Sequence, residues 1–156
     1  MKHTRGFTLI EILVAATIVA VLSVIGIVSY TSINKRSRDA KRKSDLEAVR
    51  SALEMYRSDK SSYPGASASF EALTALDNGS GSGPLVPAYL PSIPSDPRST
   101  VDVPIPYYYS PIGVGPPYYS YCICGMVEVT ADVGKNDCQA LGTALPAACN
   151  YGLRNP

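Results

Sequence analysis

The chain of 156 residues has room for one modest domain and an appendage, but not for two full hydrophobic cores. Its formal net charge is +1, and the residues beyond Lys60 carry three bases against seven acids, which argues against nucleic acid as the partner of that half. The single histidine is His3, within the first six residues. The rest of the chain therefore lacks the imidazole that a Ser-His-Asp triad, a Cys-His pair or a His-ligated metal site needs.

Residues 7–28 form an apolar run with one charge, Glu11. At 1.5 Å per residue, a helix of about 22 residues crosses a hydrocarbon layer of about 30 Å, so the run predicts a transmembrane helix. A secretory signal peptide has a shorter apolar region and ends at a small-residue cleavage site, which this run lacks. A plain membrane anchor is the remaining generic explanation, and it leaves Glu11 unexplained.

The carboxylate of Glu11 is the main anomaly of this run. A charged group at the centre of a spanning helix costs about 2.5–3.5 kcal/mol, so such a residue usually marks function. The structural alternative is that Glu11 lies near one end of the helix and reaches the membrane interface.

Residues 29–62 are predicted to continue the same helix, since no proline occurs before Pro64. Leu46, Val49, Leu53 and Tyr56 recur at spacings of three and four and form one apolar stripe. The flanks offer ion pairs four residues apart, namely Asp39–Lys43, Lys43–Glu47 and Arg50–Glu54. The helix should end before Tyr63-Pro64, because a residue that precedes proline disfavours the helical region.

Residues 63–156 are predicted to form a small head. A short helix fits residues 70–76, a flexible Gly/Ser tract follows, and seven prolines between residues 84 and 106 exclude long regular elements there. Residues 107–110 and 118–129 are rich in tyrosine, valine and isoleucine and predict two strands joined by a loop at residues 111–117. Residues 151–154 predict a last short strand.

The four cysteines all lie in the last third of the chain: Cys122, Cys124, Cys138 and Cys149. An even number in a small domain beyond a membrane segment indicates an exported, oxidised framework. Cys122 and Cys124 face the same side of a strand, so disulfides should run from each of them to Cys138 and Cys149 in one of two connectivities. A four-thiolate zinc site is the alternative, which the Cys-x-Cys spacing disfavours.

The sequence Gly6-Phe7-Thr8-Leu9-Ile10-Glu11 resembles the signature of type IV prepilins and type II secretion pseudopilins. The resemblance implies that residues 1–6 are a leader, which a membrane prepilin peptidase cuts after Gly6, and that the same enzyme methylates the new amino terminus at Phe7. It further implies that Glu11 pairs with the amino terminus of a neighbouring subunit and sets the axial register of a filament.

Three further stretches, residues 37–46, 52–56 and 62–64, resemble the stalk of the major, G-type pseudopilins, and residues 89–91, 94–97 and 107–109 resemble their entry to the sheet. The implied fold is α+β, a pilin-like lollipop whose long helix packs its second half on a small antiparallel sheet. Val28 stands where many relatives carry a proline. Some major pseudopilins bind calcium in the C-terminal loop, where Asp132 and Asp137 are weak candidates beside the commoner explanation of solvated turn acids.

The implied function is that of a structural subunit, not an enzyme, in a type IV pilus-like or type II secretion pseudopilus filament, with no cofactor expected apart from that calcium. The expected partners are identical and related pilin subunits, the prepilin peptidase, a membrane assembly platform and its ATPase, and the membrane before assembly. A minor adhesive or DNA-uptake pilin at a filament tip and a plain anchored surface domain are the alternatives.

The expected topology is a single pass with the amino terminus in the cytoplasm and the head outside. Six bases at residues 35–43 would favour the opposite orientation by the positive-inside rule. The family's orientation and the clustered cysteines outweigh that rule here.

Overall fold

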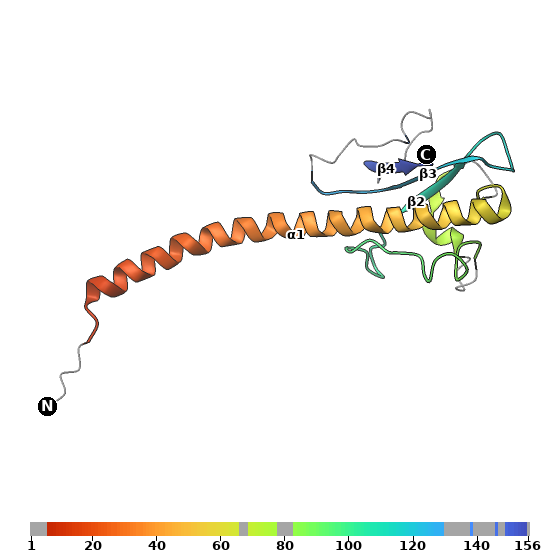
Figure 1. Ribbon diagram of the computed structural model, residues 1–156. Helices are drawn as coiled ribbons and strands as arrows, with labels where there is room; N and C mark the ends of the chain where they lie inside the picture. Colours follow the sequence, from red (N-terminus) through yellow and green to blue (C-terminus); the bar gives the residue numbers. More distant parts are fainter. Residues whose placement is uncertain are drawn as a thin grey trace. The chain divides into compact units, whose positions relative to one another are not determined.

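The computed structural model describes residues 6–65 (without the side chain of Val28), 69–77, 83–129, 138, 146 and 149–155. Its elements are helix α1 (Leu9–Lys60), strand β1 (Glu71–Ala72), 3-10 helix η1 (Leu73–Leu76), and strands β2 (Tyr108–Ile112), β3 (Ser120–Gly125) and β4 (Tyr151–Arg154) (Figure 1). The predicted α+β class, one long helix followed by an antiparallel sheet, is confirmed. Contacts divide the chain into two compact units, Met1–Ser37 and Arg38–Pro156.

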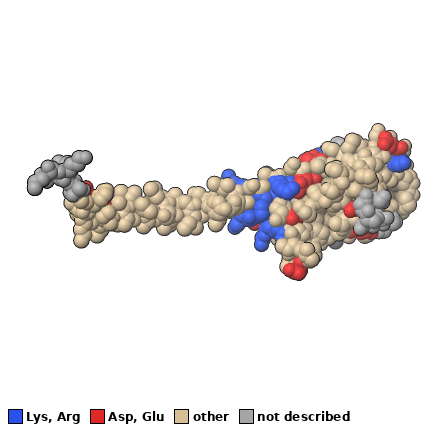
Figure 2. Space-filling view, turned by 90° about the horizontal axis from the view of Figure 1, so that it is seen from below, with Lys and Arg blue, Asp and Glu red and all other residues tan. Residues whose placement is uncertain are grey.

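The first unit contains the N-terminal part of α1. Every described side chain from residue 6 to residue 27 is exposed, and no proline interrupts the helix. By length and composition this is one helix that could cross a membrane, with a mean hydropathy of 2.7 over its most apolar window and none of that window buried. Its surface is almost uniformly uncharged in the space-filling view (Figure 2).

The second unit contains the last part of α1, residues 38–60. The predicted stripe turns inward, since Leu46, Val49 and Leu53 are fully buried. The helix ends at Lys60, as predicted, and Ser61 has a left-handed φ of 62° that turns the chain toward Tyr63-Pro64.

The sheet has the order β1-β2-β3-β4, with each neighbouring pair antiparallel. In Figure 1, β2, β3 and β4 lie side by side along the C-terminal part of α1, and the segment between η1 and β2 runs along another side of that helix. The inner face of the sheet meets the stripe of α1 in one core. Its main members from outside the helix are Tyr63, Leu73, Leu85, Tyr107, Tyr109, Tyr118, Tyr121, Ile123 and Leu153.

The outer face of the sheet has a second, smaller core. It consists of the four cysteines with Phe70, Tyr108 and Ile112 packed against them. This follows from strand alternation, because Tyr121 and Ile123 point to the helix while Cys122 and Cys124 point away from it. The head therefore buries both faces of β3.

Two local predictions need correction. The short helix expected at residues 70–76 is a two-residue strand followed by the four-residue η1, because residues 71–72 pair with β2. Asp39 pairs with Arg42, and Arg50 pairs with Glu47, each three residues apart where spacings of four were predicted. Glu54 instead accepts hydrogen bonds from the hydroxyls of Tyr63 and Tyr121.

Candidate functional site

The start of α1 carries the residues that the sequence motif singles out. Thr8 and Glu11 form a reciprocal cap: the Glu11 N–H donates to Thr8 Oγ1 at 3.3 Å, and Glu11 Oε2 accepts from the Thr8 N–H at 2.8 Å and from its hydroxyl at 2.7 Å. These bonds satisfy donors that the first helical turn leaves free. Glu11 therefore lies at the helix terminus, which agrees with the structural alternative for this carboxylate and leaves its negative charge next to the amino-terminal end.

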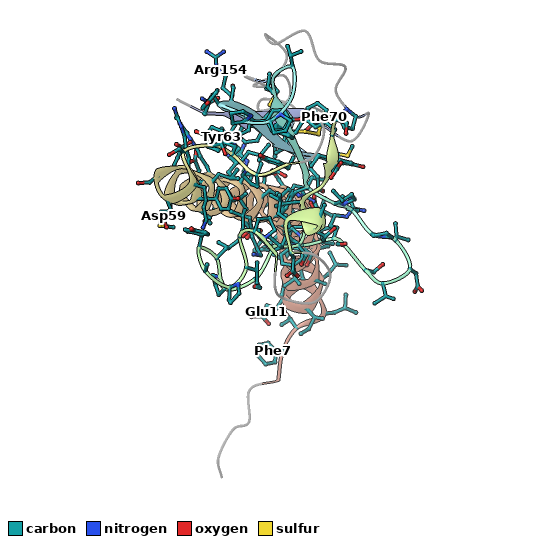
Figure 3. The ribbon with its side chains drawn as sticks, turned by 90° about the vertical axis from the view of Figure 1, so that its right-hand side faces the viewer. Phe7, Glu11, Asp59, Tyr63, Phe70 and Arg154 are labelled. Atoms are coloured by element: carbon teal, nitrogen blue, oxygen red, sulfur yellow. A yellow bond between two sulfur atoms is a disulfide. The ribbon has the colours of Figure 1, made fainter. Side chains whose placement is uncertain are left out.

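Thr8 is a residue of this segment that the sequence reasoning overlooked. The signal was present, because Thr8-x-x-Glu11 ahead of an apolar run matches the capping-box pattern. Figure 3 shows Phe7 and Glu11 at the first turn of α1. Replacement of Thr8 would loosen the position of the Glu11 carboxylate without changing its charge.

The apolar side chains around this cap are exposed to solvent in the first unit. Phe7 is 85% exposed, Leu9 84% and Ile10 68%. A continuous apolar surface of this length is unstable in water, because burial is worth about 25 cal/mol per Å² of apolar surface. The segment can therefore insert into a bilayer or pack against apolar helices of other subunits.

The second unit holds a buried ion cluster centred on Arg42, whose side chain is 3% exposed. Its Nε and Nη2 donate to the two carboxylate oxygens of Asp96 at 2.6 and 3.0 Å. Its Nη1 donates to Asp39 at 2.7 Å and to Glu128 at 2.8 Å. The fork on Asp96 is the bidentate geometry that only arginine provides.

Two further arginines complete this cluster. Arg38 forms a second fork on Glu128, with its Nε and Nη2 at 2.8 and 2.7 Å from the carboxylate oxygens. Arg98 Nη1 lies 3.7 Å from Glu128. Three guanidinium groups thus face three carboxylates. We call Arg38, Asp39, Arg42, Asp96, Arg98 and Glu128 the head clamp.

The head clamp connects α1 to two distant segments of the head. Asp39 accepts the backbone N–H groups of Glu128 and Val129 at 2.8–3.0 Å, and Asp96 accepts that of Arg98 at 2.8 Å. The helix is therefore fixed both to the chain that follows β3 and to the proline-rich segment around residue 96. The sequence reasoning missed this, because it assigned Arg42 to a basic run and Asp96 to a family-like stretch.

The charges of the head clamp perturb one another. The hydrogen bonds from Arg38 lower the pKa of the Glu128 carboxyl to about 2, and those from Arg42 act in the same direction against partial burial. Burial alone would lower the pKa of Arg42, but its bonds to Asp96, Glu128 and Asp39 raise it above the ordinary arginine value. Arg38, Arg42 and Glu128 are therefore ionised near neutral pH.

This ionisation predicts an acid-sensitive part of the head's stability. Because the folded pKa of Glu128 lies below the ordinary value of 4.5, its contribution is full above about pH 5 and is lost as the pH falls toward about 2. We expect the free energy of unfolding of the wild-type chain, measured with urea in detergent, to fall between about pH 5 and 2. The free energy of unfolding of Glu128→Gln should fall less steeply over the same range. Equal slopes for the two proteins would contradict this assignment.

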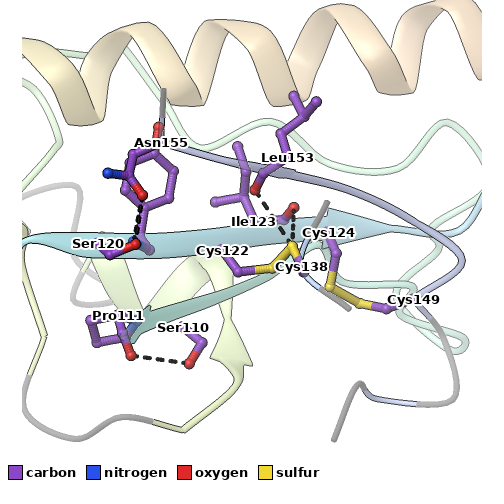
Figure 4. The surroundings of a disulfide bond; sticks show 11 residues. Ser110, Pro111, Ser120, Cys122, Ile123, Cys124, Cys138, Cys149, Leu153 and Asn155 are labelled. Carbon is purple, nitrogen blue, oxygen red and sulfur yellow. Dashed lines mark hydrogen bonds between the residues drawn. A yellow bond between two sulfur atoms is a disulfide. The ribbon is translucent and has the colours of Figure 1, made fainter. Parts of the chain in front are cut away.

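The cysteines form two disulfides, Cys122–Cys138 and Cys124–Cys149, with Cα–Cα distances of 5.6 and 5.5 Å. This is one of the two connectivities left open by the sequence. Figure 4 shows both bonds leaving the same face of β3. The bonds cover the outer face of the sheet, and sulfur in this form is not available as a thiolate ligand for zinc.

The described residues contain no group of three His, Cys, Asp or Glu side chains that could hold a metal ion. The calcium candidates Asp132 and Asp137 lie outside the described residues.

Comparisons with known proteins connect these features. Residues 1–27 match the family model described as the prokaryotic N-terminal methylation motif, and residues 29–137 match the one described as type II secretion system (T2SS), protein G. The type II secretion system core protein G of Pseudomonas aeruginosa is 30% identical over 87% of this chain and 97% of its own length. That of Klebsiella pneumoniae is 32% identical over 62% and 71%.

A pilin is also among the relatives. The type IV major pilin protein PilA of Myxococcus xanthus is 33% identical over 39% of this chain and 28% of its own length. No solved structure matches the chain significantly.

Proposed function

The chain belongs to the family of type II secretion system G proteins, and we propose on that premise that it is a structural subunit of a type II secretion pseudopilus. The observation that carries the proposal is an N-terminal methylation motif followed by an exposed apolar helix in one unit, in a chain whose other unit has its own core. The subunit has no catalytic task in this proposal: the helix drives assembly, and the head faces the surface of the filament.

Processing creates the working amino terminus. A prepilin peptidase cuts after Gly6 and methylates Phe7, in line with the methylation motif that spans residues 1–27. Gly6 suits the cut because a residue without a side chain offers the peptidase an unhindered backbone. The apolar helix is retained, unlike the apolar region of a secretory signal peptide.

Assembly transfers the helix from lipid to other helices. An apolar rod leaves the bilayer at an acceptable free energy only when it is buried against neighbouring rods, which couples extraction to polymerisation. A membrane platform and its ATPase supply the work. The Glu11 carboxylate pairs with the methylated amino terminus of a neighbouring subunit and sets the axial register.

The amino terminus lies in the cytoplasm before assembly, and the head lies outside. The basic run at residues 35–43 opposes this orientation by the positive-inside rule, and the orientation of the family outweighs it. The two disulfides are also typical of an oxidising, extracytoplasmic compartment.

The test is the intact mass and N-terminal peptide of the full chain after co-expression with a prepilin peptidase. We expect a chain that begins at Phe7 and carries a methyl group on its amine. A matched control is Gly6→Leu, which places a branched side chain at the cut and should leave residues 1–6 attached. A wild-type chain that still begins at Met1, or one cut beyond Val28, would overturn the proposal.

A further inference from the structure

The two disulfides of the head cross each other along the sequence. Cys122 bonds Cys138 across 16 residues, and Cys124 bonds Cys149 across 25 residues. Each bond therefore skips the next cysteine in the chain. If the head is exported from its N-terminal side, the cysteines reach the new compartment in the order Cys122, Cys124, Cys138, Cys149. Cysteines that arrive one after the other are never native partners.

The fold, and not proximity in sequence, selects this pairing. Cys122 and Cys124 lie on the outer face of β3, two residues or about 7 Å apart, and each fixes the position of one partner. Cys138 is 1% exposed, and its Sγ lies 3.5 Å from the carbonyl oxygen of Leu153 in the adjacent strand. Exchanging the partners would move Cys138 by about the separation of Cys122 and Cys124 and remove it from this buried place.

The unfolded chain has no comparable preference. The loops that Cys122–Cys149 and Cys124–Cys138 would close differ from the native loops by less than about twofold in length. Such a difference changes the closure free energy by less than about 0.6 kcal/mol. Four cysteines allow three complete pairings, and the third, Cys122–Cys124 with Cys138–Cys149, closes much shorter loops than the other two. Oxidation before folding should therefore give the native pairing in roughly a third of molecules or fewer.

We propose that maturation of this head includes disulfide exchange by a thiol–disulfide isomerase in the compartment that receives the head. The inference rests on the proposed export for its setting, but its chemistry depends only on the crossed connectivity. An oxidant of the dithiol–disulfide class first takes two electrons and two protons from each pair of thiols. The isomerase then redistributes the bonds without net oxidation.

The exchange balances for the wrong pairing Cys124–Cys138 with Cys122–Cys149. The isomerase thiolate attacks Cys138, forms a mixed disulfide with it and releases the Cys124 thiolate. The Cys124 thiolate attacks Cys149 and releases the Cys122 thiolate. The Cys122 thiolate attacks Cys138 in the mixed disulfide, which completes both native bonds and returns the isomerase thiolate.

Burial gives the exchange its direction. The cysteines are between 0% and 8% exposed in the folded head. Native bonds are thereby shielded from further attack, whereas a wrong pairing that keeps the outer core open leaves its sulfur atoms accessible. Phe70, Tyr108 and Ile112 pack on the sulfur atoms and close this core; Phe70 lies beside them in Figure 3.

The test uses the full chain in detergent, reduced, unfolded in urea and oxidised there with diamide. The oxidant is removed, and the chain is then diluted out of urea with or without a catalytic amount of a purified thiol–disulfide isomerase in its reduced form. Peptide mapping by mass spectrometry under non-reducing conditions gives the fraction with both native bonds. We expect roughly a third or less without the isomerase and a rise of about threefold or more with it. Native pairing that is complete in diamide alone, or a fraction that the isomerase leaves unchanged, would overturn the proposal.

Two double variants provide matched controls. Cys122→Ser with Cys138→Ser leaves only Cys124 and Cys149, and Cys124→Ser with Cys149→Ser leaves only the other native pair. Each has a single intramolecular pairing, so the isomerase should give no gain in its yield even if the fold is weakened. A threefold gain in either variant would show that the isomerase acts otherwise than by exchange. This readout is independent of the N-terminus, so a chain that retains Met1 would overturn the filament proposal alone.

Discussion

Replacing Arg42 with methionine is expected to lower the free energy of unfolding of the head by about 3–5 kcal/mol. Methionine fills a similar volume but leaves the carboxylates of Asp39 and Asp96 buried without their counter-charge; these residues are 2% and 3% exposed. Removing one partner of a buried pair costs far more than the pair contributes, because the remaining charge keeps its desolvation penalty. Urea unfolding of the full chain in detergent, followed by the near-UV signal of its 11 tyrosines, measures the change.

Lys41→Met is the matched control on the preceding residue of the same helix. Lys41 is 57% exposed in its side chain and pairs with Asp45 four residues on, so its loss should cost about 0.5 kcal/mol or less. Combining Arg42→Met with Asp96→Asn should cost less than the sum of the single changes, because the second removes a charge that the first leaves unpaired. A loss below about 1 kcal/mol for Arg42→Met would show that the head clamp contributes little to the stability of the head.

The head clamp also determines which parts of the head loosen first. Arg42 is the common partner of the segment around Asp96 and of Glu128, which follows β3. Without it, the segment around Asp96 loses its ion pair with the helix, and Glu128 retains its bonds to Arg38 and Asp39 but loses the one to Arg42. Asp39 also loses its counter-charge, which weakens its hold on the Glu128 and Val129 amides, while the core around Leu46 and Leu53 keeps its packing. Hydrogen exchange in Arg42→Met should therefore rise at the Glu128 and Val129 amides before it rises in β3.

The parts of the fold that follow from local periodicity could be predicted from the sequence. The stripe at Leu46, Val49 and Leu53 repeats at helical spacing, and all three side chains are buried as a helix of 3.6 residues per turn requires. The two-residue separation of Cys122 and Cys124 likewise placed both on one face of a strand, which disfavours a bond between them, and the structure pairs each with another cysteine.

The remaining features depend on contacts between residues far apart in the sequence. Arg42 meets Asp96 across 54 residues and Glu128 across 86, and no spacing rule pairs residues at such distances. Asp39 was placed in a local ion pair on the flank of the apolar stripe, because charge patterns along one helix cannot show that this side faces another segment. The choice between the two disulfide connectivities also depended on where the chain after β3 returns to the sheet, which composition does not encode.

Replacing Glu11 should abolish filaments. Two variants can separate the loss of its charge from the loss of its capping hydrogen bond at the start of α1. Glu11→Gln keeps an oxygen that can accept the Thr8 N–H, since glutamine also serves in capping boxes, but it removes the charge. Glu11→Ala removes both. If the carboxylate pairs with the amine of a neighbouring subunit, both variants should lose assembly, because a buried amine without its counter-charge costs several kcal/mol. Filament yield by electron microscopy, with co-expressed assembly proteins, measures this.

Thr8→Val completes the comparison, because it removes the hydroxyl of the cap and leaves the Glu11 charge and the Thr8 backbone donor in place. We expect it to keep filaments at a reduced yield, in keeping with a cap worth about 1 kcal/mol. Glu47→Gln, an exposed carboxylate on the same helix, should leave the yield unchanged. Wild-type yield in Glu11→Gln would show that Glu11 acts as a helix cap and not as a counter-charge. The register of the filament would then have to come from the packing of the apolar side chains of α1.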